Sequence, residues 1–130
     1  MRIAIRVDSS PTIGEGHFFR CFNLAREFVR RRIEVVFVCN ELKYGHAELV
    51  HNLGCTLIEI SSGDNEAADA SDFLDAVASF DPGIVVVDSY KLKVDWESHV
   101  RSSIKTLVVI ADLPDVKHSC DFLVYQNLTD

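Results

Sequence analysis

The sequence predicts an α/β protein in which one parallel β-sheet lies between two layers of helices, a three-layer arrangement. Short apolar runs bounded by turn residues alternate with longer segments of helical period, which is typical of successive βαβ units. Runs such as IVVVD and TLVVIAD are continuously apolar, as strands covered on both faces usually are. With 130 residues, 48% of them hydrophobic, the chain is expected to form one domain, 1–130.

Six segments are predicted to be strands, because each is a short run of apolar and β-branched residues that stops at a polar or turn-forming residue. Four further segments are predicted to be helices, because their apolar residues recur at spacings of three and four. The predicted strands are Arg2 to Val7, Glu34 to Cys39, Thr56 to Ile60, Ile84 to Asp88, Thr106 to Ala111 and Phe122 to Tyr125. The predicted helices are about Phe18 to Arg30, His46 to Leu53, Glu66 to Ser79 and Val94 to Ser102.

Polar residues gather at the ends of the predicted strands. Right-handed crossovers give an open, doubly wound sheet, and such sheets bind ligands at the carboxyl ends of their strands. The sequence therefore predicts a ligand site at one edge of the sheet. The residues at or just after strand ends are Asp8, Asn40, Asp88, Ser89, Tyr90 and Asp112.

The composition excludes several classes of partner. A net charge of -7 and a pI near 5.1 argue against a nucleic-acid or membrane-surface protein, which usually carries a basic excess. The first residues do not form a positively charged segment followed by an apolar stretch. No apolar run reaches the roughly 18 residues that a membrane-spanning helix needs. Four cysteines stand singly in apolar runs, so we expect reduced core thiols in a cytoplasmic protein.

The turn GEGH, residues 14–17, joins the first strand to the first helix. A dinucleotide fingerprint fits poorly, because its third glycine would fall at Phe19. A histidine side chain gains and loses a proton near neutral pH, as a general base must. His17 is expected at the carboxyl edge of the sheet, where Asp8 could orient its ring. The residues alone leave open a second interpretation, in which the His17 ring bonds to backbone at the helix start.

Three separated motifs resemble one enzyme family. They are IRVDSSPTIGEGHFFRCFNLAREFVRR, VVVDSYKLKVDWE and VVIADLPDVKHSCDFLVYQNL, which begin at Ile5, Val85 and Val108. All three, in this order, are similar to motifs of the UDP-sugar hydrolases of pseudaminic acid biosynthesis (PseG) and of the related spore coat polysaccharide proteins (SpsG). Together they span most of the chain.

The resemblance implies a two-domain GT-B fold of the MurG-like glycosyltransferase type, of which this chain corresponds to the N-terminal, Rossmann-like half. The C-terminal half, which holds most of the nucleotide in that family, is absent from the chain, so the isolated domain is expected to be inactive. That second domain and a UDP-linked amino sugar are the implied partners. The sequence leaves open whether the chain forms a homo-oligomer.

The implied reaction is hydrolysis of a UDP-2,4-diacetamido-2,4,6-trideoxyhexose, in which water attacks the anomeric carbon with inversion and UDP is released. UDP leaves as a stabilised anion, so one base that activates water is sufficient. By resemblance, the catalytic base is His17. The residues expected to bind substrate are Asp8, Gly14, Gly16, Arg20, Asp88, Tyr90 and Asp112.

No cofactor and no metal are expected, because the pair His118 and Cys120 lacks a second pair of ligands nearby. We interpret His118 as structural and Cys120 as a core residue. Ala111 and Tyr125 stand where the family usually has aspartates, so an altered sugar preference, closer to the spore coat branch, is expected.

Two other functions stay open from the sequence. A glycosyltransferase would use the same cleft with the hydroxyl of a sugar acceptor in place of water. A non-catalytic domain would keep the fold and bind only a sugar or a partner.

Overall fold

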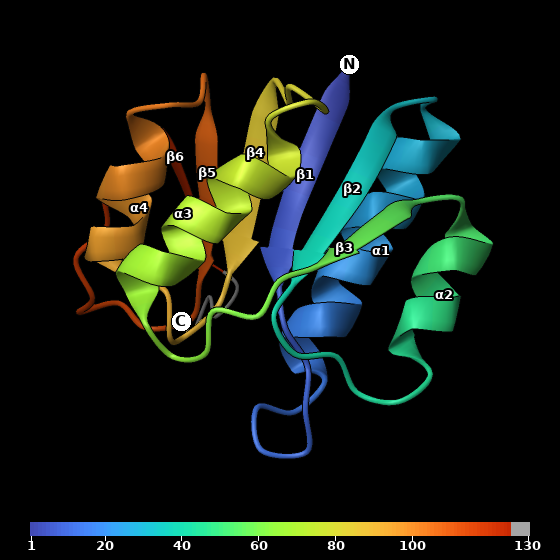
Figure 1. The fold of residues 1–130 in the computed structure, drawn as a ribbon, viewed down its shortest axis with the longest axis horizontal. Helices are drawn as coiled ribbons and strands as arrows, with labels where there is room; N and C mark the ends of the chain where they lie inside the picture. Colours follow the sequence, from blue (N-terminus) through green and yellow to red (C-terminus); the bar gives the residue numbers. More distant parts are fainter. Residues whose placement is uncertain (126–130) are drawn as a thin grey trace.

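The computed structural model describes residues 1–125, which form one six-stranded sheet in which every pairing is parallel (Figure 1). The strand order is β3-β2-β1-β4-β5-β6, so between β3 and β4 the chain returns from the β3 edge, past β2 and β1, to the middle of the sheet. The elements are β1 (Arg2–Val7), α1 (Gly16–Arg30), β2 (Glu34–Cys39), α2 (His46–Leu53), β3 (Thr56–Glu59), α3 (Glu66–Val77), β4 (Ile84–Asp88), α4 (Val94–Arg101), β5 (Leu107–Ala111) and β6 (Phe122–Tyr125).

The predicted fold class is confirmed, and the elements agree closely with their predicted bounds. Strands β3 and β5 are each one residue shorter than expected, although the Ile60 N–H and the Thr106 carbonyl still make backbone hydrogen bonds to neighbouring strands. Helix α1 starts two residues early, at Gly16, and α3 ends two residues early, at Val77. These differences lie at element ends, where short local patterns carry the least information.

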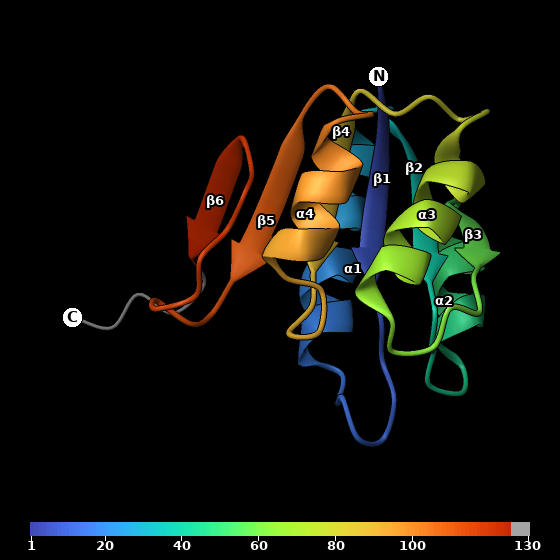
Figure 2. The same ribbon diagram turned by 60° about the vertical axis from the view of Figure 1, so that its left-hand side comes forward.

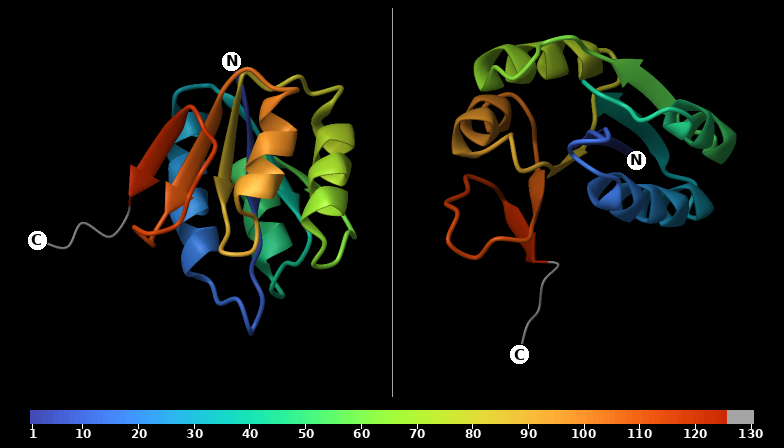
Figure 3. Two further views of the ribbon diagram at one scale, coloured as in Figure 1. Left: turned by 90° about the vertical axis from the view of Figure 1, so that its left-hand side faces the viewer. Right: turned by 90° about the horizontal axis from the view of Figure 1, so that it is seen from below.

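Helices cover both faces of the sheet (Figure 3). On one face, α1 and α2 pack against the odd-numbered β1 side chains, with Phe18 and Val50 in the core. On the other face, α3 and α4 bury Phe73 and Trp96, both fully buried. Both faces of the central strands are therefore buried, which explains their continuous hydrophobicity.

The four cysteines are free thiols. Cys21, Cys39 and Cys55 are buried, while Cys120 is half-buried against the core that α3 and α4 form. The predicted core position is thus confirmed for Cys21, Cys39 and Cys55, whereas Cys120 lies at the edge of the core.

The loops that follow β1 and β4 lie together at the carboxyl edge of the sheet, and β6 forms one lateral edge (Figures 1 and 2). The long loop after β1 turns back through a bridge between Ser10 and Gly14, whose N–H donates to the Ser10 carbonyl over 2.7 Å. Gly14 has a φ of 88°, which side chains with a Cβ rarely adopt. Within residues 1–125, none of the helices has the length and apolar character needed to cross a membrane.

Candidate functional site

Five polar side chains meet where the start of α1 faces the carboxyl ends of β4 and β5. We refer to this group as the His17 network. Two of its members, His17 and Arg20, are one turn apart on α1, and the other three follow or end strands. The His17 network consists of His17, Arg20, Asp88, Tyr90 and Asp112.

The centre of the network is the pair His17 and Asp88. The His17 Nδ1 makes a short hydrogen bond with Asp88 Oδ1, and the Asp88 side chain is completely buried. An ionised carboxylate can only accept a hydrogen bond, so the ring carries its proton on Nδ1 when it is neutral. The lone pair is then on Nε2, to which no residue among 1–125 donates a hydrogen bond. This is the tautomer that a general base requires.

Arg20 holds both carboxylates of the network. Its Nε and Nη2 donate to the two Asp88 oxygens, each over 2.6 Å, and its Nη1 donates to Asp112 Oδ1 over 2.7 Å. Arg20 Nη2 also lies 3.1 Å from His17 Nδ1, because both nitrogens donate to the same Asp88 oxygen. Two carboxylates thus face one guanidinium, and their hydrogen bonds raise the pKa of Arg20. The Arg20 contact in turn lowers the pKa of Asp112.

Tyr90 covers the histidine from the solvent side. Its ring meets the His17 ring edge-on, with 4.4 Å between the ring centres, and half of the residue is exposed. The Tyr90 hydroxyl donates to Asp112 Oδ2 over 2.7 Å, and this bond raises the pKa of the tyrosine. The tyrosine is therefore anchored at its tip and borders the histidine with its edge.

Two pockets open next to this network, and His17, Ser89 and Tyr90 line both of them. The first has a volume of about 180 Å³ and continues between β5 and the segment that follows it, past Asp112 and His118. The second, of about 470 Å³, lies toward the loop after β1 and has Asp8 and Asp88 on its wall. A ligand in either cavity can therefore contact His17.

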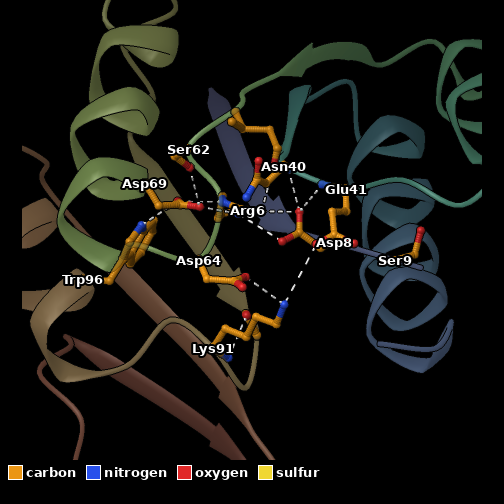
Figure 4. Close-up of polar contacts among 12 residues, drawn as sticks. Arg6, Asp8, Ser9, Asn40, Glu41, Ser62, Asp64, Asp69, Lys91 and Trp96 are labelled. Carbon is orange, nitrogen blue, oxygen red and sulfur yellow. Dashed lines mark hydrogen bonds and ion pairs between the residues drawn. The ribbon is translucent and has the colours of Figure 1, made fainter. Parts of the chain in front are cut away.

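Asp8 does not orient His17, contrary to the expectation from the sequence. Arg6 donates to both Asp8 oxygens over 2.6 and 3.1 Å, and the backbone N–H groups of Asn40 and Glu41 donate to Oδ1 (Figure 4). These contacts hold the start of the β1 loop against the end of β2. Asp8 still borders the second pocket, so a contact with substrate stays a prediction.

Arg6 belongs to a second buried polar cluster, on the face of the sheet that α3 covers (Figure 4). Its guanidinium, 1% exposed, also donates to both oxygens of Asp69 on α3, over 3.0 and 2.6 Å. The Trp96 indole N–H donates to the same carboxylate over 2.9 Å. Burial opposes the charge of Arg6, but its hydrogen bonds to Asp69 and Asp8 raise its pKa. This cluster ties β1 to α3 and α4.

The alternation of side chains explains why Asp88 rather than Asp8 meets the histidine. Successive side chains of a strand point to opposite faces. Arg6 and Asp8 are on the face of α3, as the Asp69 contact shows, whereas Val86 and hence Asp88 are on the face of α1. Helix α1 carries His17, so only the β4 carboxylate can reach it.

The glycines of the turn and His46 both shape the loop after β1. Neither Gly14 nor Gly16 lines either pocket, and their expected contact with substrate stays a prediction. His46, at the start of α2, is buried. Its ring stacks on Phe18 with 4.1 Å between centres, and its Nδ1 bonds to the Ser9 hydroxyl over 2.7 Å. His46 thereby fixes the loop after β1.

His118 is the pocket residue whose place the sequence analysis missed. The sequence predicts a structural role for it, yet it lines the first pocket together with His17. Its only sequence signal is its place in the third motif, close to Asp112. Among residues 1–125, no group of three or more His, Cys, Asp or Glu is arranged to hold a metal.

Of the two positions that depart from the motif pattern, Ala111 precedes Asp112 and lines the first pocket, whereas Tyr125 ends β6. Ala111 is buried in the core at the end of β5, and the Tyr125 hydroxyl donates to the Pro114 carbonyl over 3.0 Å. The rest of the third motif, 126–128, lies outside the described residues.

Comparisons with known proteins support the fold. No family model matches the chain. It is 24% identical over 108 residues to an uncharacterized protein of Methanocaldococcus jannaschii, and the match covers 83% of this chain but 21% of that protein. A crystal structure assigned as a UDP-N-acetylglucosamine 2-epimerase from Listeria monocytogenes superposes with a TM-score of 0.54 at 13% identity, over 86% of this chain and 31% of that one. The chain thus spans a fraction of both proteins, and the second likeness shows the Rossmann-like fold.

Proposed function

We propose that this chain is the catalytic-base domain of a nucleotide-sugar hydrolase. In the proposed reaction, water attacks the anomeric carbon of a UDP-2,4-diacetamido-2,4,6-trideoxyhexose with inversion, and UDP leaves. The proposal rests on one observation: an imidazole whose Nδ1 is bonded to a buried carboxylate and which lines two pockets at the carboxyl edge of the sheet. The structural likeness to a protein assigned as a UDP-sugar enzyme and the motif resemblance point to the same substrate class.

In this mechanism, His17 Nε2 removes a proton from the attacking water. The proton that stays on Nδ1 remains bonded to Asp88, so the imidazolium that forms is held by a buried negative charge. Arg20 supplies one positive charge against the two carboxylates Asp88 and Asp112. The network therefore carries a net charge of minus one before the reaction. It becomes neutral when His17 gains the proton, so the surrounding carboxylates stabilise the positive charge that develops on the imidazole.

The leaving group requires little from this domain. UDP departs as an anion and needs no strong acid, so one base satisfies the inverting displacement. We propose that a second domain of the full-length protein holds the nucleotide, and that binding energy from that end of the substrate positions the anomeric carbon near His17. The chain alone is then inactive.

UDP release from a panel of UDP-N-acetyl and UDP-diacetamido hexoses by the full-length protein tests the proposal. His17→Ala should lower the rate by about 10²- to 10⁴-fold, the usual contribution of a general base. His51→Ala, on the exposed side of α2, is the matched control and should leave the rate unchanged. The anomeric configuration of the first sugar product, followed by NMR, should be inverted.

Three results would contradict the proposal. UDP release at an unchanged rate in His17→Ala would show that His17 is not the catalytic base. Transfer of the sugar to an added acceptor faster than to water would identify a glycosyltransferase that uses the same residue. Saturable binding of the sugar nucleotides without any turnover would indicate a binding domain.

A further inference from the structure

A second histidine, His118, is held by a buried carboxylate in the wall of the first pocket. Its Nδ1 lies 2.8 Å from Oε2 of Glu97 on α4, and the Glu97 side chain is completely buried. The other Glu97 oxygen accepts the backbone N–H of Ser119 over 2.7 Å. Glu97 thus fixes both the ring of His118 and the backbone next to it.

The other ring nitrogen of His118 has no hydrogen bond. Nε2 is buried and lacks a partner among residues 1–125, the one side-chain nitrogen or oxygen there of which this is true. Buried polar atoms in proteins are nearly always paired, so each exception calls for an explanation. Here the unpaired atom belongs to a side chain that lines the same pocket as His17.

We propose that His118 Nε2 accepts a hydrogen bond from a hydroxyl or amide N–H of the ligand that fills the first pocket. The pocket then has two histidines with different tasks: His17 receives the proton of water, and His118 binds the sugar. Glu97 is a positioning residue, since it contacts His118 and does not line the pocket. The nature of the ligand, a sugar nucleotide, rests on the proposed function.

The Glu97 contact determines which hydrogen bond His118 can make. An ionised Glu97 accepts from Nδ1–H, and the neutral ring therefore presents a lone pair at Nε2. Glu97→Gln keeps the acceptor for Ser119 but turns an amide N–H toward Nδ1, so the ring proton moves to Nε2. The ring keeps its place, but Nε2 becomes a donor and can no longer accept the ligand's hydrogen.

Ligand binding can be measured without turnover. We would titrate the full-length protein with UDP-N-acetylglucosamine and with a UDP-diacetamido hexose, and record Kd by calorimetry together with the ring ¹⁵N shifts of His118. His118→Phe keeps a ring of similar size and should weaken binding about five- to tenfold, the size of one lost hydrogen bond. Glu97→Gln should weaken it similarly, while His51→Phe, the control, should bind like the wild type.

The expected signature in the wild type is a change of the Nε2 shift, and not of the Nδ1 shift, when ligand saturates the protein. Unchanged ring shifts at saturation, or wild-type affinity in folded His118→Phe, would overturn the inference. The shift measurement needs no variant, so it decides the matter even if His118→Phe fails to fold. If the sugars bind through His118 but are not hydrolysed, the proposed function fails and this inference stands; if no sugar nucleotide binds, both fail.

Discussion

Asp88, the last residue of β4, accepts a hydrogen bond from His17, which lies 71 residues earlier in the first turn of α1. The two residues come together because β1 and β4 are neighbours in the sheet and α1 packs over the face to which Asp88 points. The bond fixes the histidine tautomer, and Arg20 fixes the carboxylate in turn. Several predictions about chemistry and stability rest on this relationship and on the buried charges around it.

Replacing Asp88 by asparagine should abolish most activity without removing the histidine. The amide N–H of the new side chain would donate to His17 Nδ1, so the ring proton moves to Nε2 and the lone pair is lost. We expect kcat for UDP release to fall by about 10³- to 10⁴-fold, as a wrong tautomer does in hydrolases with a similar pair. Steady-state rates of the full-length protein check this, and Asp75→Asn on the exposed side of α3 is the control. A loss below about tenfold would show that Asp88 does not set the tautomer.

Arg6→Met should strongly destabilise the domain. It leaves the carboxylates of Asp8 and Asp69, both buried, without their shared guanidinium. Removing one partner of a buried ion pair costs about 3 to 5 kcal/mol in the free energy of unfolding.

The measurement for this prediction is urea unfolding of the 130-residue chain. Arg2→Met on the same strand is the control, because Arg2 and its partner Glu34 are largely exposed, and it should change stability by less than about 0.5 kcal/mol. Similar unfolding midpoints for the two variants would mean that the Arg6 cluster contributes little.

The domain should lose stability in acid partly through Asp112. Arg20 lowers the pKa of this carboxyl in the folded protein, so the unfolded chain binds more protons near pH 4. The stabilisation is fully present above the unfolded pKa, about 3.9, and is lost as the pH falls through the lower folded value.

Asp112→Asn should therefore flatten the fall of the urea midpoint between about pH 5 and pH 3 relative to the wild type. The contribution of Asp121, whose pKa the Leu107 backbone N–H lowers, is common to both proteins and does not affect the comparison. Identical pH profiles would show that the Arg20 contact does not persist in solution.

The thiols should be poorly reactive in the native state. Burial raises the pKa of Cys21 and Cys39, and that of Cys55 to about 11, so little thiolate forms near pH 8. A colorimetric thiol reagent should modify Cys120, the half-buried one, first and should titrate four thiols rapidly in urea. Rapid modification of Cys21 in folded protein would mean that the region behind Asp88 opens easily, because its sulfur lies 3.7 Å from that carboxylate.

The sequence by itself determined the order of the strands and helices, and their bounds to within two residues. Continuous apolar runs and three- and four-residue spacings are local properties, and they are visible without the fold. The sequence also placed Asp8, Asp88, Tyr90 and Asp112 at one edge, because parallel strands all end on the same side. The prediction that His17 is the catalytic base rests on its place in the turn before the first helix and on the motif resemblance.

Only the tertiary structure decided which of these groups meet. The strands are buried on both faces, so their apolar pattern does not tell which face each residue takes or which helix covers it. For that reason Asp8 and Asp88 look equivalent in the sequence, yet one pairs with Arg6 on the α3 side and the other with His17 on the α1 side. The same holds for His118, whose place beside the His17 pocket depends on the path of the chain between β5 and β6 and on the buried Glu97.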